Sequence, residues 1–257
     1  MVELKLNSEK YNTLLRCFLA LKDVCNDIDI RDGVIRQRSN DKTSIFEIDM
    51  RNLFSGENDV DITGINIAIS DVKSKVDLLK AFSGQEINLE IESGDNSYFI
   101  LSDQFSSVKF ISPSLQFMDN KFMSENQLSA IFSLEEDDLI LETEMSNMIT
   151  ERIRVITGSF HTDVIQVNFR GEEAMVTAAT QAKDQFAKII TGITTNMIFD
   201  KCSANLSNIP FVIDHDTEVE FKMYKDPNQD VSLNQFVTSI GDVNLTILTR
   251  SSIIQDE

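Results

Sequence analysis

The sequence is short of the residues that build metal and disulfide sites. Its 257 residues include only three cysteines (Cys17, Cys25, Cys202) and two histidines (His161, His215), scattered along the chain. No CxxC or HExxH spacing occurs, so neither a structural zinc site nor a bound cofactor is expected. An odd number of cysteines in a chain of cytosolic type favours reduced, buried thiols.

Long apolar runs are also missing. No stretch approaches the roughly 20 apolar residues that span a bilayer, so no membrane association is expected. The N-terminus, MVELKLNSEK, lacks the apolar core of a signal peptide. The expected location is therefore the cytoplasm, which is the host cytoplasm for a viral protein, or the nucleus in a eukaryote.

Positive charge is scarce, because 23 Lys and Arg residues face 42 Asp and Glu residues and leave a net charge of −19. Taken alone, this balance argues against nucleic acid as a ligand, since phosphate-binding proteins normally carry a basic surplus. An acidic surface commonly serves solubility. The hydrophobic content of 42% is that of a folded protein, and the length suits one large or two ordinary domains.

With only three prolines and nine glycines, long alternating runs dominate the sequence. The period-2 pattern predicts strands at 86–93, 97–103 and 106–112, and within 163–180 and 217–236. Turns are predicted at SGDN (93–96), RGEE (170–173) and DPNQ (226–229).

Four segments break the strand rhythm and predict helices: 8–25, 70–82, 146–158 and, most weakly, 199–207. Ser8 and Ser70 are the expected N-caps of the first two, and Gly158 is the expected end of the third.

The order of helix, strands, helix and strands occurs twice, which predicts two similar α+β domains. The join is expected within 112–127, where the strand period lapses and Pro113, Asp119 and Asn120 occur. The predicted divisions are an N-terminal domain (1–112), a connector (113–128) and a C-terminal domain (129–257).

The scarce cations collect in the predicted helices. These four segments sum to +3, so the rest of the chain carries −22. On the first helix the apolar side chains share one face, whereas Arg16 lies opposite and Lys22 at the rim. An outward cationic surface would attract a polyanion, because screening over about 8–10 Å hides the acidic remainder. The alternative is ordinary ion pairing along a solvated helix face.

Several stretches resemble the trimeric DNA sliding clamps, the family of proliferating cell nuclear antigen and the clamp of T-even-type phages. The resemblance is carried by 14–50, with ALKD and TSIFEIDM, and by 75–101, 152–167 and the acidic end IIQDE. It implies a homotrimeric ring of six domains. Such a ring is a non-enzymatic processivity factor that encircles duplex DNA and binds DNA polymerase and a clamp loader.

By resemblance, Arg16, Lys22, Lys80 and Arg154 match cationic positions that line the hole of the ring. Helix membership alone adds five weaker candidates: Lys10, Lys73, Lys75, Arg152 and Lys201. Asp77 stands where the family commonly has lysine, and Leu15 interrupts a basic pair. The hole is therefore expected to be less positive than in cellular relatives.

The resemblance also implies contacts between subunits and a groove for partner peptides. Subunits would pair through 106–111, with Val108 and Phe110, and 184–190, with Phe186 and Ile189. The alternative is that both are internal strands. The groove beneath the connector is expected to be lined by Ile45, Phe117, Met118, Pro210 and Ile253. The alternative is that these residues only pin the connector to the sheets.

Two other functions remain open at this stage. The chain is a subunit of a hetero-oligomeric clamp-like adaptor, or it is an enzyme that uses an acidic cluster such as SLEEDD (133–138). For that cluster an acidic turn is the favoured interpretation, because the ligand spacing of a hard-cation loop is missing.

Overall fold

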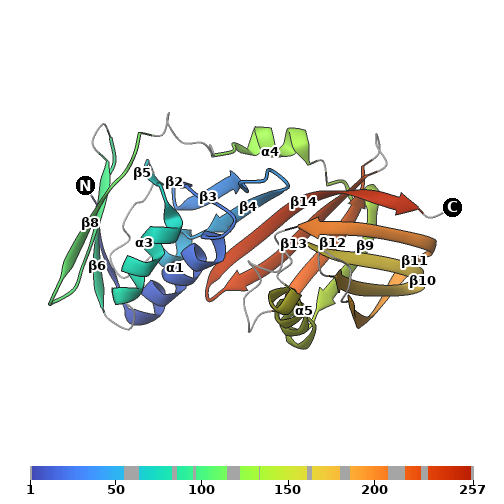
Figure 1. Ribbon diagram of the computed structural model, residues 1–257. Helices are drawn as coiled ribbons and strands as arrows, with labels where there is room; N and C mark the ends of the chain where they lie inside the picture. Colours follow the sequence, from blue (N-terminus) through green and yellow to red (C-terminus); the bar gives the residue numbers. More distant parts are fainter. Residues whose placement is uncertain are drawn as a thin grey trace. The chain divides into compact units, whose positions relative to one another are not determined.

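The computed structural model describes residues 2–54, 64–82, 86–94, 97–114, 122–132, 134–160, 164–179, 186–207, 218–226 and 231–255. The chain divides into two compact units. The N-terminal unit comprises Met1–Ser124 with Ser239–Leu245, and the C-terminal unit comprises Glu125–Thr238 with Thr246–Glu257. Both combine antiparallel strands with few helices, which confirms the predicted α+β class (Figure 1).

The N-terminal unit contains two sets of antiparallel strands. The first is a sheet of β1 (Val2–Leu6), β6 (Ile87–Glu92), β7 (Tyr98–Ser102) and β8 (Ser107–Ile111), in that order. The second has the order β5 (Asn66–Ile69), β2 (Ile28–Arg31), β3 (Val34–Arg38) and β4 (Ser44–Asp49). The helices are α1 (Ser8–Leu21), α2 (Arg51–Phe54) and α3 (Val72–Leu79), and a 3₁₀ turn (Lys80–Phe82) follows α3. The strands predicted at 86–93, 97–103 and 106–112 are confirmed.

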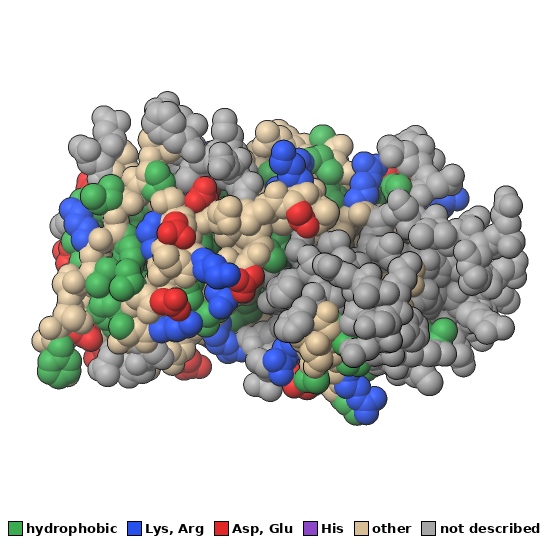
Figure 2. Space-filling view, viewed as in Figure 1, with side chains coloured by type: hydrophobic (Ala, Val, Ile, Leu, Met, Phe, Trp, Pro, Cys, Tyr) green, Lys and Arg blue, Asp and Glu red, His purple; other side chains and the backbone are tan. Residues whose placement is uncertain are grey.

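Helix α1 forms because its apolar residues recur at helical spacing. Tyr11, Leu14, Leu15, Phe18 and Leu21 are buried on one side. The opposite side is polar and lies on the surface of the unit (Figure 2). The predicted helix was therefore right in its buried face, although it ends at Leu21 and not at residue 25.

Each observed N-cap lies one residue away from the predicted one. The N-cap of α1 is Asn7, whose Oδ1 accepts a hydrogen bond from the backbone N–H of Lys10 at 2.8 Å. At the start of α3 the N-cap is Asp71, which has a left-handed φ of 51° and makes no side-chain cap. Ser8 and Ser70 are therefore not the caps.

A tight hairpin between β2 and β3 was missed by the sequence analysis. Asp32 and Gly33 connect the strands with φ of 49° and 76°. Two successive positive φ values define the primed turn that matches the twist of a hairpin, and Asp-Gly is among its preferred sequences.

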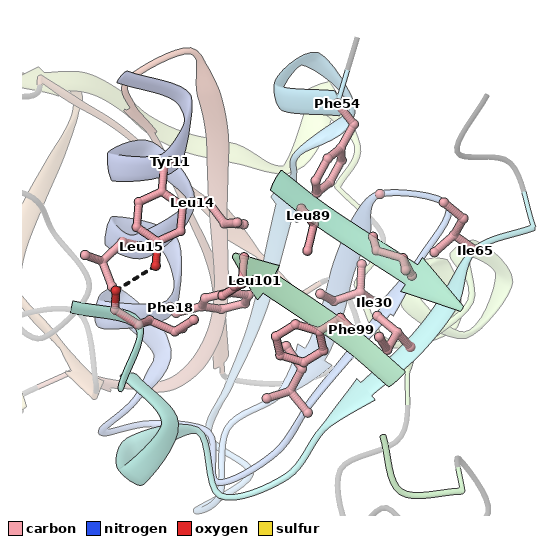
Figure 3. Close-up of a pocket in the computed structure, with 15 residues that line it drawn as sticks. Tyr11, Leu14, Leu15, Phe18, Ile30, Phe54, Ile65, Leu89, Phe99 and Leu101 are labelled. Atoms are coloured by element: carbon pink, nitrogen blue, oxygen red, sulfur yellow. Dashed lines mark hydrogen bonds between the residues drawn. The ribbon is translucent and has the colours of Figure 1, made fainter. Parts of the chain in front are cut away.

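The core of the N-terminal unit holds an apolar cavity of about 40 Å³. Figure 3 shows it between α1 and strands from both sets, with lining residues that include Leu14, Phe18, Ile30, Leu89 and Phe99. The one polar contact drawn there is the Tyr11 hydroxyl, which donates to the Leu79 carbonyl at 2.6 Å. Burial raises the pKa of Tyr11 above its ordinary value, so the hydroxyl stays protonated and remains a donor.

The C-terminal unit contains β9 (Leu139–Met145), β12 (Val219–Lys225), the long pair β10 (Val164–Ala179) and β11 (Phe186–Ser207), and most of β13 (Val231–Ile240) and β14 (Val243–Gln255). Its helices are α4 (Glu125–Ile131) and α5 (Asn147–Phe160), with a 3₁₀ turn at Glu136–Asp138. Phe221 of β12 stacks on Phe236 of β13, with ring centroids 4.6 Å apart, and anchors the core face of these strands.

Three predictions for this unit were wrong. The segment 199–207 is not a helix, because it lies in β11 and pairs with the start of β10. RGEE is not a turn, because β10 continues through it with register shifts on both sides of Gly171. Gly158 does not end a helix, since α5 continues to Phe160. Short polar segments give weak local signals, and the pairing of β10 with β11 decided the first two cases.

We predict that Tyr11→Phe lowers the free energy of unfolding by about 1–3 kcal/mol, because the buried Leu79 carbonyl loses its donor. Urea denaturation measures this change. Tyr98→Phe, at a half-exposed ring, is the matched control and should leave stability nearly unchanged. Equal stability of the Tyr11→Phe protein and the parent would contradict the prediction.

Candidate nucleic-acid interface

Helices α1 and α3 lie next to each other on the surface of the N-terminal unit (Figure 1). The Tyr11–Leu79 hydrogen bond joins them, and the backbone N–H of Val72 donates to the Asn26 carbonyl at 2.9 Å. The helix pair, the C-cap of α1 and the following 3₁₀ turn carry six predicted DNA-facing cations: Lys10, Arg16, Lys22, Lys73, Lys75 and Lys80. Lys73 and Lys80 are exposed, and the other four are half-buried.

Three of these lysines gather around two carboxylates, and we call Lys22, Lys73 and Lys80 the lysine patch. Lys73 Nζ lies 3.0 Å and Lys22 Nζ 3.8 Å from the carboxylate of Asp23. Lys80 Nζ lies 2.9 Å from the Asp77 carboxylate. Figure 2 shows basic and acidic side chains interspersed on this helix side.

The carboxylates weaken the positive field of the lysine patch without cancelling it. The hydrogen bond from Lys80, followed by the charges of Lys80, Lys22 and Lys73, lowers the pKa of Asp77 below its ordinary value. Asp77 is therefore ionised at neutral pH. Part of this surface therefore agrees with the alternative interpretation, in which the cations form ion pairs on a solvated helix face. Such exposed pairs contribute little to stability.

Lys75 is placed differently from the lysine patch. Its half-buried ammonium donates to the backbone carbonyl of Ser70 and to the Ser70 hydroxyl, the latter at 3.1 Å. Burial lowers the pKa of Lys75, although the charges of Asp71 and Asp27 oppose this shift. The side chain thus supports the start of α3.

The outward side of α5 in the C-terminal unit is only partly cationic. Arg152 is exposed, and Arg154 forms an ion pair of 2.7 Å with Glu151 one turn earlier. Met148 and Val155, which share a helical stripe with Arg152, are 59% and 50% exposed. The buried side contains Ile149 and Ile153. This helix therefore offers phosphate a sparse set of positive charges.

Lys201 was predicted to face DNA because it was expected to lie on a fourth helix, at 199–207. It lies in β11, so that argument does not hold.

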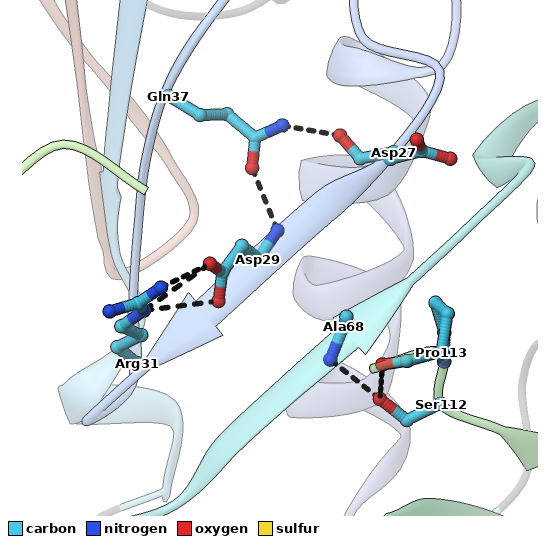
Figure 4. Close-up of polar contacts among 7 residues, drawn as sticks. All are labelled: Asp27, Asp29, Arg31, Gln37, Ala68, Ser112 and Pro113. Atoms are coloured by element: carbon cyan, nitrogen blue, oxygen red, sulfur yellow. Dashed lines mark hydrogen bonds and ion pairs between the residues drawn. The ribbon is translucent and has the colours of Figure 1, made fainter. Parts of the chain in front are cut away.

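The predicted connector is anchored to the N-terminal unit where it begins. The Ser112 hydroxyl accepts a hydrogen bond from the Ala68 backbone N–H of β5 at 2.8 Å (Figure 4). The Ser112 backbone N–H donates to the Ser97 carbonyl, also at 2.8 Å. Ser112 is buried despite its polarity because both of these groups are paired.

A second anchor, which the sequence analysis missed, lies at Phe122. The guanidinium groups of Arg31 and Arg36 lie 5.0 and 5.8 Å from the Phe122 ring centroid, within the range of cation–π attraction. Arg31 is held by the buried carboxylate of Asp29 at 2.8 Å (Figure 4). The backbone N–H of Met123 donates to the Arg36 carbonyl at 2.8 Å. No pattern within the connector sequence indicates these partners.

The predicted groove residues are only partly described. Ile45 on β4 is 3% exposed and packs into the core. Ile253 lies in β14 opposite Ala204 of β11. Phe117, Met118 and Pro210 lie outside the described residues.

Of the two strands predicted to join subunits, β8 is an outer strand of its four-stranded sheet among the described residues, and the Phe186–Ile190 stretch of β11 is described through its pairing with β10. Phe110 of β8 is buried and stacks on Phe99 with centroids 4.6 Å apart, whereas Val108 is half-buried. Phe186 and Ile189 pair with Ala179 and Val176 of β10.

Within the described parts of the chain, no group of three or more His, Cys, Asp or Glu side chains is arranged to hold a metal ion. The Glu136–Asp138 part of the acidic cluster forms a 3₁₀ turn. Among the residues that the structure describes, no helix is long and apolar enough to cross a bilayer.

No protein-family model matches the sequence, and no characterised protein matches it by sequence. Solved structures do match along the whole chain. Proliferating cellular nuclear antigen (PCNA) from Entamoeba histolytica aligns with a TM-score of 0.62 at 14% identity, covering 97% of this chain and 98% of that one. The chain has the sliding-clamp fold.

Two further clamp structures agree with this assignment. The PCNA of A. fulgidus, bound to the C-terminal region of FEN-1, aligns with a TM-score of 0.61 at 12% identity and covers 100% of both chains. A PCNA2–PCNA3 complex from Sulfolobus tokodaii aligns with a TM-score of 0.58 at 14% identity, covering 97% and 99%. The clamp fold inferred from sequence resemblance is therefore confirmed.

We predict that Asp77→Asn increases the affinity of the clamp for duplex DNA by about two- to eightfold at about 0.1 M salt, because one carboxylate no longer offsets the lysine patch. Fluorescence anisotropy of a short labelled duplex over a salt series measures the change. Glu3→Gln, an equal charge change at an exposed position of β1, is the control. A steeper salt dependence should appear only in the Asp77 variant.

Proposed function

We propose that the chain is a sliding clamp without enzymatic activity: three copies close a ring around duplex DNA and hold a DNA polymerase on its template. The observation that carries this proposal is the match of the whole chain to three PCNA structures, with 97–100% of each chain covered. A fold alone does not define a function, so the lysine patch supplies the second support.

The proposed hold on DNA is topological, with weak phosphate contacts. Arg16 and the lysine patch on the N-terminal unit and Arg152 and Arg154 on the C-terminal unit are the proposed contacts, with Lys10 as a secondary one. Nonspecific attraction to phosphate is weak and salt-dependent. Ion pairing with Asp23, Asp77 and Glu151 weakens it further, which suits a ring that must slide.

The proposed partners are a DNA polymerase and a clamp loader. The A. fulgidus PCNA is bound to the C-terminal region of FEN-1, which shows that a clamp of this fold takes a terminal segment of a partner protein. We propose that the present chain binds short segments of its partners in the same manner, through connector residues that include Phe117 and Met118. This role places the protein in the cytoplasm, or in the nucleus of a eukaryote.

The oligomeric state tests the proposal most directly. Sedimentation equilibrium over a wide concentration range should show a species of about three times the 29.1 kDa chain mass. The second candidate is a subunit of a hetero-oligomeric ring, which the S. tokodaii PCNA2–PCNA3 complex favours because it contains two different clamp chains. A chain that stays monomeric at all concentrations would contradict the homotrimer.

We predict that Arg16→Glu combined with Lys80→Glu reduces processive synthesis on circular primed DNA by about tenfold or more at moderate salt, since repulsion replaces attraction at two phosphate contacts per subunit. Circular dichroism should show an unchanged fold. Lys5→Glu combined with Lys225→Glu, at exposed sheet positions, makes the same change in net charge and should retain activity. If both double variants lose processive synthesis to the same extent, Arg16 and Lys80 do not belong to a DNA-facing surface.

A separate prediction concerns the partner segment. Phe117→Ala combined with Met118→Ala should abolish stimulation of the polymerase while leaving the trimer intact, because two apolar contacts of the connector are lost. Primer extension and sedimentation measure the two properties. The control is Phe105→Ala, which also removes an apolar side chain from the N-terminal unit. At concentrations where this variant is trimeric, it should still stimulate the polymerase. Stimulation that survives the double substitution would exclude these connector residues from partner binding.

A further inference from the structure

The hairpin between β7 and β8 presents an unusual side chain to solvent. Phe105 in its turn is 81% exposed, the highest value among the described large hydrophobic residues. The others are Leu78, Ile111, Met148 and Val155, at 50–75%. Exposing a whole phenyl ring to water is unfavourable, so an aromatic residue held in this way suggests that a surface covers it in the functional assembly.

The turn that carries Phe105 is ordered by hydrogen bonds. Asp103 Oδ1 accepts from the backbone N–H groups of Phe105 and Ser106 at 2.8 and 2.7 Å, and from the Ser106 hydroxyl at 3.0 Å. The Asp103 backbone N–H donates to the Ser106 carbonyl at 3.0 Å. These contacts lower the pKa of Asp103, the bond from Phe105 first, so its carboxylate is ionised at neutral pH and caps the turn. The backbone that carries Phe105 is therefore ordered before binding, which reduces the entropy lost on binding.

This turn adjoins an open sheet edge. β8 follows directly at Ser107 and pairs with β7 as the last strand of its sheet (Figure 1). Its buried residue, Phe110, faces the core, and Ile111 at its far end is 75% exposed. An edge of this kind offers backbone N–H and C=O groups to another strand.

A stretch of the C-terminal unit is the expected counterpart of the β8 edge. The Phe186–Ile190 stretch, FAKII, pairs with β10 among the described pairings, and β14 pairs with β11 further along, at Cys202–Ala204. This stretch is rich in apolar residues. Because β8 and this stretch belong to different units, a contact between them in two copies is head-to-tail, and such a contact builds a closed ring where the rotation between copies closes. A second copy is therefore the occupant that the chain itself supplies for the surface around Phe105.

We propose that Phe105 is an anchor of the contact between subunits: when the β8 edge of one copy meets the next copy, the Phe105 ring is buried against that copy. The inference rests on the proposed ring and adds to it a residue outside the paired strands. Aromatic residues, phenylalanine included, are enriched at protein–protein interfaces.

The chain contains no tryptophan, so Phe105→Trp would introduce a single fluorescent reporter at this position. We expect its emission to shift to shorter wavelength as protein concentration rises, over the range in which sedimentation shows assembly. Leu78→Trp on α3, at a position that is 51% exposed, is the matched control and should not shift. If the trimer forms while the emission of the Phe105→Trp variant stays that of an exposed indole, Phe105 is not buried by a second copy and the proposal is wrong.

The energetic test uses truncation. Phe105→Ala should raise the dissociation constant of the trimer by about ten- to a hundredfold, whereas Leu78→Ala should leave it unchanged. Asp103→Ala should weaken assembly several-fold through loss of the ordered turn, and Asp103→Asn, which keeps an acceptor oxygen, should restore much of it. Equal urea midpoints of the variants as monomers would show that folding is intact.

The outcomes separate this inference from the proposed function. A parent protein that stays monomeric overturns both the ring and the anchor. A parent trimer with an unchanged Phe105→Ala dissociation constant overturns the anchor alone. Emission of the Phe105→Trp variant that shifts only after another protein is added overturns it in favour of a different occupant.

Discussion

The burial of one helix side against strands is the packing constraint on which the rest of the described structure depends. In the N-terminal unit, Tyr11, Leu14 and Phe18 of α1 pack toward inward-facing residues of both strand sets, and the Tyr11 hydroxyl ties α3 to the same helix. Ile149 and Ile153 give α5 an equivalent buried side in the C-terminal unit. Because the apolar stripe must face inward, the polar side of each helix is forced onto the surface. The lysine patch is a consequence of this packing.

Electrostatics then limits what that surface can do. The chain has a net charge of −19, and Asp23 and Asp77 lie within ion-pair distance of the lysine patch, so its positive charge is partly offset. A weak, salt-sensitive attraction is insufficient to retain a ligand by affinity. It is sufficient for a protein that keeps DNA by encircling it, where tight contacts would oppose sliding. The charge pattern and the clamp fold are therefore consistent with one mechanism.

Two kinds of polar order outside the core support the proposed interactions. The connector is fixed to the N-terminal unit at Ser112 and at Phe122, which lies beside two arginine side chains. The β7–β8 turn is fixed by the Asp103 carboxylate next to an open edge. Cation–π contacts hold the Phe122 ring, and hydrogen bonds order the backbone that carries Phe105. Ordered apolar groups of this kind lower the entropic cost of association.

The sequence by itself determined the α+β class, the buried face of α1 and the strands β6, β7 and β8, because a period of 3.6 or 2 is a local property of the chain. It did not determine that 199–207 is a strand, since the deciding hydrogen bonds come from β10, more than twenty residues away in sequence. It did not show that Lys75 turns back to Ser70, that Lys80 pairs with Asp77, or that Arg31 and Arg36 hold Phe122. Those contacts depend on side-chain directions and on strands brought together by folding. Periodicity assigns a residue to a face, and only the tertiary structure decides which groups it meets there.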